Sequence, residues 1–220
     1  MRKDYYNPMR NLAIIVPFLA MTIFLCDSPA QQPPASTLKA AALESHEGVT
    51  ISAQPWTDAA SYKAKFPKKS PLTWGIVAIN TTIRNDSDDS MKVDLEQIRL
   101  NVTVSEENRQ ALPSLSADDV ADASTQAQKK DPTETRRSPI PIPKGPKTGR
   151  DKHWMEMQKA AADAAIASSI VAPHHSVQGL LYFDLQGQLD LLHTAHLYVP
   201  DVRALEKNHA LVYFEIDLSR

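Results

Sequence analysis

Two blocks of this chain alternate apolar and polar residues with a period of two, and this alternation limits the fold more than any other feature. In the first block, one side of a predicted strand carries Val77, Ile79, Thr81 and Ile83. In the second block, the same spacing joins Val177, Gly179, Leu181, Phe183 and Leu185. Because successive side chains of a strand point to opposite faces of a sheet, both blocks predict strands with one buried face.

Extended over both blocks, the alternation predicts six or seven strands. We expect strands over residues 48–53, 77–84, 91–104, 177–185, 189–199 (whole or interrupted) and 212–218. A change of parity between Leu95 and Ile98 predicts a β-bulge, and the polar stretches 85–90 and 186–187 predict turns. A short helical stretch is expected over 202–207. Short strands joined by polar turns predict a mainly β fold, an antiparallel Ig-like sandwich made of residues 47–112 and 174–220.

Residues 113–173 interrupt this pattern and are predicted to form a helical, Pro-rich insertion. Ser116 precedes an acidic first turn and predicts the N-cap of a short helix over 117–121. Residues 124–150 are predicted to be disordered or extended, since the prolines of 138–146 favour polyproline II. Asp151 predicts the cap of a second helix of about 20 residues, which ends before Pro173. One stripe of this helix is expected to dock on the sandwich: Trp154, Met157, Ala161, Ala164 and Ala165.

The first thirty residues predict export. Residues 1–10 are polar and basic, residues 12–26 are apolar apart from Thr22, and a small-residue stretch ends at Ala30. This order is typical of a secretory signal peptide. The apolar run has 15 residues and spans about 22 Å as a helix, which is short of a hydrocarbon core of about 30 Å. We therefore predict a signal peptide over 1–30, a flexible tether over 31–46, and a periplasmic or extracellular location.

Cys26 leaves open whether the exported chain is anchored. The sequence Ile23-Phe24-Leu25-Cys26 loosely resembles a lipobox, although Leu25 is larger than the residue that normally precedes a lipid-bearing cysteine. A lipid on Cys26 is the alternative to a soluble product, and it is the way in which we expect this chain to hold a membrane. Residues 27–220 contain no cysteine, so the exported domain is expected to fold without a disulfide.

A family resemblance rests on a strand, a polar turn and a second strand. The run Gly75-Ile76-Val77-Ala78-Ile79-Asn80-Thr81-Thr82-Ile83-Arg84-Asn85-Asp86-Ser87, followed by Val93-Asp94-Leu95 and Ile98-Arg99-Leu100, resembles the core of exported bacterial Ig-like modules of uncharacterised function. The block Gly179-Leu180-Leu181-Tyr182-Phe183-Asp184-Leu185 is similar to the same plan. The resemblance covers about half of the chain. It implies export and a non-enzymatic domain, and it supplies no active-site residue.

Basic residues concentrate in the Pro-rich part of the insertion. Residues 129–152 carry eight Lys or Arg and three acidic residues, a net charge of +5, whereas the whole chain has a net charge of −2. The basic residues of this segment are Lys129, Lys130, Arg136, Arg137, Lys144, Lys147, Arg150 and Lys152. A cationic segment on an acidic body suits an anionic envelope surface or a protein partner, and a solvated linker is the alternative. Because the chain lacks an overall basic excess, no nucleic-acid partner is expected.

Histidines offer a candidate for metal or hydrolytic chemistry. His174 and His175 follow the second helix of the insertion, and with a distant carboxylate they would form such a site. His193 and His196 are expected on one strand, where their odd spacing places the two side chains on opposite faces of a sheet. Joint binding of a metal by His193 and His196 is therefore not expected.

Other signatures of chemistry are absent from the sequence. The acidic turn of Asp86, Asp88 and Asp89 lacks the spacing, the central glycine and the terminal glutamate of an EF-hand loop, so a solvated hairpin turn is expected. The sequence contains no Gly-x-Ser-x-Gly, P-loop or His-Glu-x-x-His motif. We predict no cofactor and no catalytic or metal-binding residues, and an exported, non-enzymatic binding or structural protein of the bacterial envelope. A metal-dependent or hydrolytic enzyme that uses the histidines near the insertion is the alternative.

Overall fold

The structure, a computed structural model, describes residues 41–105, 108–129, 152–211 and 213–219. Within these residues the fold is mainly β, and twelve strands form three four-stranded sheets. Every pairing between these strands is antiparallel. The mainly β, antiparallel class predicted from the alternation is confirmed, whereas the predicted Ig-like sandwich is not confirmed, because three sheets are present. The signal peptide, Cys26 and residues 31–40 of the predicted tether lie outside the described residues.

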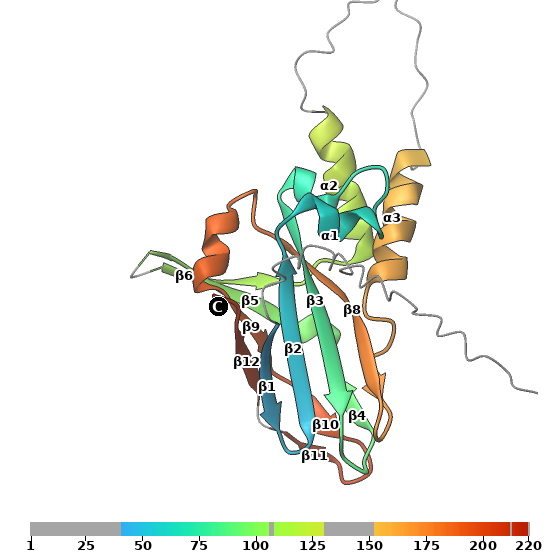
Figure 1. Ribbon diagram of the computed structural model, residues 1–220, viewed down its shortest axis with the longest axis vertical. Helices are drawn as coiled ribbons and strands as arrows, with labels where there is room; N and C mark the ends of the chain where they lie inside the picture. Colours follow the sequence, from blue (N-terminus) through green and yellow to red (C-terminus); the bar gives the residue numbers. More distant parts are fainter. Residues whose placement is uncertain (1–40, 106–107, 130–151, 212, 220) are drawn as a thin grey trace, which may run out of the picture. The chain divides into compact units, whose positions relative to one another are not determined.

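The first sheet contains the two alternating blocks on neighbouring strands. Its order is β1 (Ala42–His46), β2 (Val49–Trp56), β3 (Ile76–Asn85) and β8 (Ser176–Asp184). The register of β3 and β8 places Ile79 opposite Leu181. Figure 1 shows this sheet in front of β9 and β12. The strands predicted over 77–84 and 177–185 are confirmed, and β1 corrects the tether, because residues 42–46 belong to the sheet.

The other two sheets are made of shorter strands from both halves of the chain. The second sheet has the order β11 (His209–Ala210), β10 (Val202–Ala204), β4 (Met91–Val93) and β7 (Ile170–Val171). The third has the order β12 (Phe214–Asp217), β9 (His196–Val199), β5 (Arg99–Ser105) and β6 (Asn108–Pro113). Because the strands of each sheet come from distant parts of the sequence, local alternation did not predict which strands pair.

Three local predictions in these sheets were wrong. The segment 91–104 is not one bulged strand, because the 3-10 helix η2 (Leu95–Gln97) separates β4 from β5 and sends them to different sheets. The segment 189–199 begins with the 3-10 helix η4 (Leu189–Thr194), and only its end, β9, is a strand. Residues 202–204 form β10 where a short helix was expected. Of these three segments, residues 202–204 are held as a strand by pairing with β4 and β11.

One apolar core joins all three sheets. From the first sheet it buries side chains of β2, β3 and β8. From the second sheet it buries side chains of β4, β7 and β10, and from the third those of β5, β9 and β12. Phe183, Leu197 and Phe214 are fully buried in it. At about 25 cal/mol per Å² of apolar surface removed from water, such a core is the main stabilising contribution to a domain without disulfides.

A second apolar core lies on the other face of the first sheet, where the helices pack. It joins Ile76 and Ala78 of β3 and Leu180 and Tyr182 of β8 to three helices: α1 (Ala59–Lys63), α2 (Ala117–Lys129) and α3 (Lys152–Ala164). The 3-10 helix η1 (Pro71–Trp74) closes the same side. Figure 1 shows the helices gathered at one end of the sheet. This end, called the helical end below, positions the candidate site.

The insertion agrees with the sequence prediction in its contacts and differs in its lengths. The Ser116 hydroxyl accepts a hydrogen bond from the Asp119 backbone N–H at 3.2 Å, which confirms the predicted N-cap. The helix that it caps, α2, extends to Lys129, so residues 124–129 are helical where extended chain was expected. α3 ends at Ala164 and is shorter than predicted. Four residues of the predicted stripe are buried on it, Trp154, Met157, Ala161 and Ala164, whereas Ala165 follows the helix and pairs with Leu180. Residues 130–151 lie outside the described residues.

Tyr62 ties α1 to the first sheet, and its removal is our first prediction. Its buried hydroxyl accepts a hydrogen bond from the Ala78 N–H at 2.8 Å and donates one to the Trp56 carbonyl at 3.0 Å. Tyr62→Phe leaves both backbone groups without this partner, so we expect the free energy of unfolding to fall by about 2 kcal/mol in urea titrations at pH 7.

The same substitution is expected to change the alkaline stability. Burial raises the pKa of Tyr62 from 10.0 to about 12. Below pH 10 the phenol is protonated in both the folded and the unfolded states, and above that pH the unfolded chain loses its proton first, so the stability falls as the pH rises. The decline between pH 10 and 12 should be shallower in Tyr62→Phe than in the unsubstituted protein, and an equal decline would contradict this assignment.

Candidate functional site

A groove at the helical end is lined by two segments that are distant in the sequence. One is the loop that follows α1, residues 64–69, and the other is α3. The groove has a volume of about 420 Å³. Its apolar lining includes Phe66, Pro67, Met157, Ala160 and Ala164, and its charged residues are Lys65, Lys68, Lys69, Lys159, Glu156 and Asp163. We call this site the lysine-rimmed groove.

The loop is held against α3 by anchors on either side of its lysines. The Asp58 side chain caps α1 by accepting hydrogen bonds from the Ser61 N–H and hydroxyl, and these bonds lower the pKa of Asp58. After the helix, the N–H groups of Lys65 and Phe66 both donate to the Tyr62 carbonyl. The rings of Tyr62 and Phe66 are buried in the second core. Since the two aromatic side chains point inward, the lysines between and beyond them face solvent.

Two of the groove's lysines form ion pairs with α3 or within it. Lys68 Nζ lies 2.7 Å from Glu156 Oε2, and this contact lowers the pKa of Glu156. Lys159 Nζ lies 3.0 Å from Asp163 Oδ2, one turn along α3. Lys65 and Lys69 are exposed and have no acidic partner within the part of the chain that the structure describes. Among the described residues, the rim therefore keeps two positive charges without an acidic partner.

His153 adds a buried polar atom to the groove. It lies in the first turn of α3 and lines the groove, and its ring contacts Trp74 of η1 at a centroid distance of 6.1 Å. Its Nε2 is buried and has no hydrogen-bond partner among the described residues. A buried nitrogen without a partner costs free energy, so this position of α3 is destabilising.

The basic segment predicted over 129–152 begins and ends at the helical end. Lys129 is the last residue of α2 and Lys152 is the first of α3. The two helices contact each other, and the Trp154 Nε1 donates to Asp122 Oδ1 at 2.7 Å. Lys152 Nζ lies 4.0 Å from Glu156 Oε1. The other predicted contact residues of the segment, Lys130, Arg136, Arg137, Lys144, Lys147 and Arg150, lie outside the described residues.

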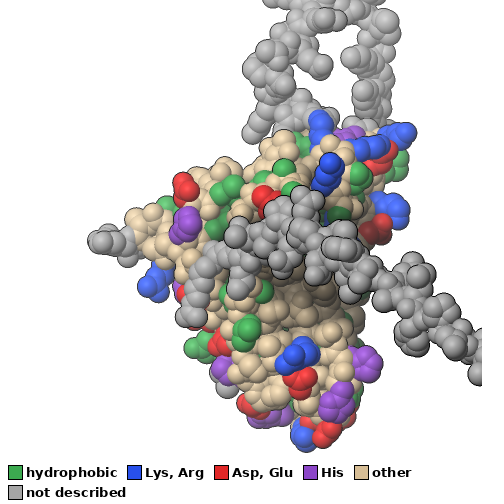
Figure 2. All heavy atoms as spheres, viewed as in Figure 1, with side chains coloured by type: hydrophobic (Ala, Val, Ile, Leu, Met, Phe, Trp, Pro, Cys, Tyr) green, Lys and Arg blue, Asp and Glu red, His purple; other side chains and the backbone are tan. Residues whose placement is uncertain are grey.

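The lysines of the groove were missed in the sequence prediction, although a local signal was present. Residues 63–69 read Lys-Ala-Lys-Phe-Pro-Lys-Lys, which places four lysines in seven residues around an aromatic ring. Figure 2 shows Lys and Arg side chains gathered over the helical end. Only the fold reveals that this loop faces α3, where the second basic segment ends.

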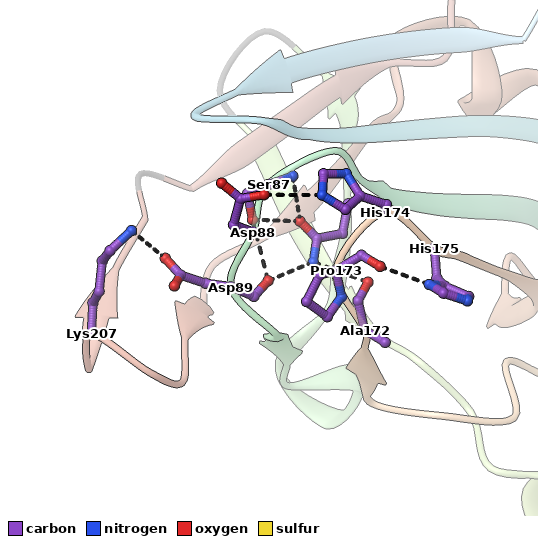
Figure 3. A network of polar contacts seen from close by, with 9 residues as sticks. Ser87, Asp88, Asp89, Ala172, Pro173, His174, His175 and Lys207 are labelled. Carbon is purple, nitrogen blue, oxygen red and sulfur yellow. Dashed lines mark hydrogen bonds and ion pairs between the residues drawn. The ribbon is translucent and has the colours of Figure 1, made fainter.

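The histidines near the insertion do not form a joint site with a carboxylate. His174 Nε2 lies 3.0 Å from Asp88 Oδ1, with both side chains exposed, whereas the His175 ring bonds to the Pro173 carbonyl at 2.7 Å. Figure 3 shows the two rings pointing apart. Asp89 is paired with Lys207 instead. No group of three or more His, Cys, Asp or Glu side chains within the described ranges is arranged to hold a metal ion.

Two details of the predicted polar turns and histidine pairs are corrected. The acidic turn 85–90 is not a hairpin turn, because it joins β3 of the first sheet to β4 of the second. His193 lies near the end of η4 and His196 begins β9, so the two histidines do not share a strand. His196 lines a shallow polar groove of the third sheet with Arg109, Glu215 and Asp217.

Comparisons with known proteins assign no family to this chain. No family model and no curated protein matches it. A functionally unknown protein from Listeria monocytogenes EGD-e, known from its crystal structure, is similar with a TM-score of 0.34 and 14% sequence identity, over 74% of each chain. A likeness at this level assigns neither a shared fold nor a function. In the described part of the chain, no helix has both the length and the apolar character needed to cross a bilayer.

Proposed function

We propose that this chain is an exported, non-enzymatic binding protein of the bacterial envelope that attaches to an anionic surface through its helical end. One observation carries the proposal. The lysine-rich segment 63–69 packs against α3, and α3 begins where the basic segment 129–152 ends. The lysine-rich loop and the two described ends of the basic segment, Lys129 and Lys152, therefore belong to the helical end of a chain whose net charge is −2.

The charge distribution favours surface attachment over a catalytic role. On the α1 loop and α3, the basic residues are Lys63, Lys65, Lys68, Lys69, Lys152 and Lys159, and the acidic residues are Glu156 and Asp163. Basic residues near an anionic membrane contribute about 1 kcal/mol each at moderate ionic strength. The histidines on which the enzyme alternative depends do not converge on a carboxylate.

The proposal includes the type of domain that the strands form. We infer that the strands around the first core form an Ig-like module of the kind found in exported bacterial proteins. Antiparallel pairing and a core common to the three sheets support this inference. The apolar run over 12–26 and the small residues before residue 31 support export, with a lipid on Cys26 as a second means of attachment.

Removal of the two unpaired lysines is expected to weaken binding to an anionic surface. We expect Lys65→Gln/Lys69→Gln, in protein recovered from a bacterial envelope, to bind phosphatidylglycerol vesicles at least tenfold more weakly at about 20 mM salt. Lys92→Gln/Arg109→Gln is the matched control, because it removes two exposed positive charges from β4 and β6. Co-sedimentation measures the vesicle binding of both variants. Equal losses of binding would show that only the net charge of the protein matters, and they would contradict the proposal.

The basic segment is tested in the same assay. We expect replacement of Arg136, Arg137, Lys144 and Lys147 with Gln to lower binding both to phosphatidylglycerol vesicles and to isolated cell-wall sacculi at low salt. Phosphatidylcholine vesicles give the charge-independent background. If binding to both anionic surfaces is unchanged, residues 129–152 are a linker. That result would refute their part in surface attachment.

A further inference from the structure

We propose that the lysine-rimmed groove binds a single-chain anionic amphiphile, a long-chain fatty acid anion, with its hydrocarbon chain in the groove and its carboxylate at the lysines. This inference deepens the proposed function and rests on it for the preference for anions, because it names the ligand class of the helical end. It is tested with a ligand in solution, so that its failure is distinct from a failure of surface attachment.

The lining of the groove suits a hydrocarbon chain. Phe66, Met157 and Ala160 present apolar side chains to the space of about 420 Å³. Small-molecule sites are typically concave, mostly apolar and about 300–1,000 Å³ in volume, so the groove is of an appropriate size. The described lining residues include no Ser, Thr, Asn or Gln. A bound peptide needs partners for its backbone amides, whereas a hydrocarbon chain needs none, so the lining favours the hydrocarbon.

The rim supplies charge of the opposite sign to a carboxylate. Lys68 and Lys159 are neutralised by Glu156 and Asp163 at 2.7 and 3.0 Å. Lys65 and Lys69 have no such partner in the described ranges and stand on the rim of the apolar space. An anion at the rim is attracted to these two lysines without breaking an existing ion pair.

His153 places an imidazole ring at the wall of the groove. Its Nε2 is buried, has no hydrogen-bond partner in the described structure, and belongs to a residue that lines the groove. Because His153 lines the groove, a bound ligand changes the surroundings of its ring. The ring of His153 is consequently a local reporter of occupancy.

The deciding experiment is calorimetric titration of the full exported chain with dodecanoate below its micelle concentration. We expect micromolar binding of dodecanoate and at least tenfold weaker binding of dodecyltrimethylammonium, which has the same chain length and the opposite charge. Butanoate, which has the charge without the chain, should bind at least tenfold more weakly as well. Equal affinity for the two dodecyl compounds would overturn the proposal.

Two substitutions locate the ligand. Ala160→Phe fills the groove from α3 and should weaken dodecanoate binding at least tenfold, while Met155→Phe, at a side chain exposed on another face of α3, should leave it unchanged. Lys65→Glu/Lys69→Glu changes only exposed residues, so it reports on the rim even if Ala160→Phe unfolds the protein. It should abolish dodecanoate binding.

Spectroscopy separates the proposed site from binding elsewhere. The imidazole nitrogen resonances of His153 should shift on addition of dodecanoate, and those of His209, at the opposite end of the sheets, should not. If affinity is retained in both groove variants, or if His153 is unmoved at saturation, the groove is not the site. Loss of vesicle binding with dodecanoate binding intact would refute surface attachment alone, and the reverse result would refute this inference alone.

Discussion

Replacement of Asn85 with alanine is expected to lower the free energy of unfolding by about 3 kcal/mol, although Asn85 is a polar residue at the end of β3. Its side chain is fully buried. The Nδ2 group donates to the Asp89, Val171 and Ala172 carbonyls at 2.7, 3.2 and 3.2 Å. The Oδ1 atom accepts from the Ser87 N–H and hydroxyl at 3.0 and 2.7 Å. The Asn85 side chain thus holds the β3–β4 turn against the loop before β8. Figure 3 labels its hydrogen-bond partners Ser87, Asp89 and Ala172.

Asn85→Asp gives the same site a pH dependence that alanine does not. The introduced carboxyl is buried and faces carbonyl oxygens, so its pKa in the folded state should lie above its unfolded value of about 3.9. Stability is then greatest below that pH and is lost as the pH rises towards the folded pKa. Urea unfolding of Asn85→Asp and Asn85→Ala at pH 4 and pH 7 measures this difference. An aspartate variant with the same loss of stability at both pH values would contradict the burial and the donor role assigned to Asn85.

Replacement of Gly179 with alanine is expected to cost about 3 kcal/mol, because there is no room for a Cβ atom at this position of β8. A Cβ there would lie 2.5 Å from the carbonyl carbon and 2.6 Å from the carbonyl oxygen of Ala165. This part of the chain crosses β8 directly after α3, and Ala165 pairs with Leu180. The atoms that clash belong to backbone, which cannot rotate away as a side chain would. The substitution therefore forces α3 away from the first sheet.

Gly187→Ala is the matched control for this substitution. A Cβ at position 187 meets nothing within 4 Å, and the cost there comes only from the left-handed backbone conformation with φ of 81°. A cost of about 1 kcal/mol is expected for that conformation. Thermal and urea unfolding of the two variants measure the difference of about 2 kcal/mol between a steric clash and backbone strain. If Gly179→Ala is no more destabilising than Gly187→Ala, α3 does not pack on β8 at this distance.

The Gly179 contact shows why the strands were easier to predict than their surroundings. The alternation that includes Gly179 correctly predicted β8, because the period of side chains along a strand is a property of the local backbone. The same pattern treats Gly179 as one more position on an apolar face. Its actual role depends on the chain at Ala165, which approaches β8 only in the folded protein.

Residues 76–79 and 180–183 are continuous apolar runs, which a search for alternation alone does not detect. Ile76, Val77, Ala78 and Ile79 are all buried, and so are Leu180, Leu181, Tyr182 and Phe183. A continuous apolar run of this kind is typical of a strand that is covered on both faces. The predicted docking stripe of α3 supplies the second cover, but neither pattern alone indicates which strands the helix covers.

The candidate site combines a local signal with a tertiary one. The cluster of lysines over 63–69 is visible in the sequence, and its attachment is explained by the buried rings of Tyr62 and Phe66. The groove itself exists only because α3 lies opposite that loop, with Lys68 and Glu156 in contact although they are separated by 88 residues. Contacts of such sequence separation leave no periodic trace in either segment.

The sequence by itself determined the mainly β class, the neighbouring strands β3 and β8, the cap of α2 and the buried stripe of α3. Each of these follows from side-chain spacing or from hydrogen bonds between residues a few positions apart. The tertiary structure alone decided that β4 and β5 belong to different sheets, that His174 and His175 do not form a joint site with a carboxylate, and that the lysine-rich loop lines a groove with α3. These features depend on which distant segments share a buried surface, and burial is a property of the whole chain rather than of any short stretch.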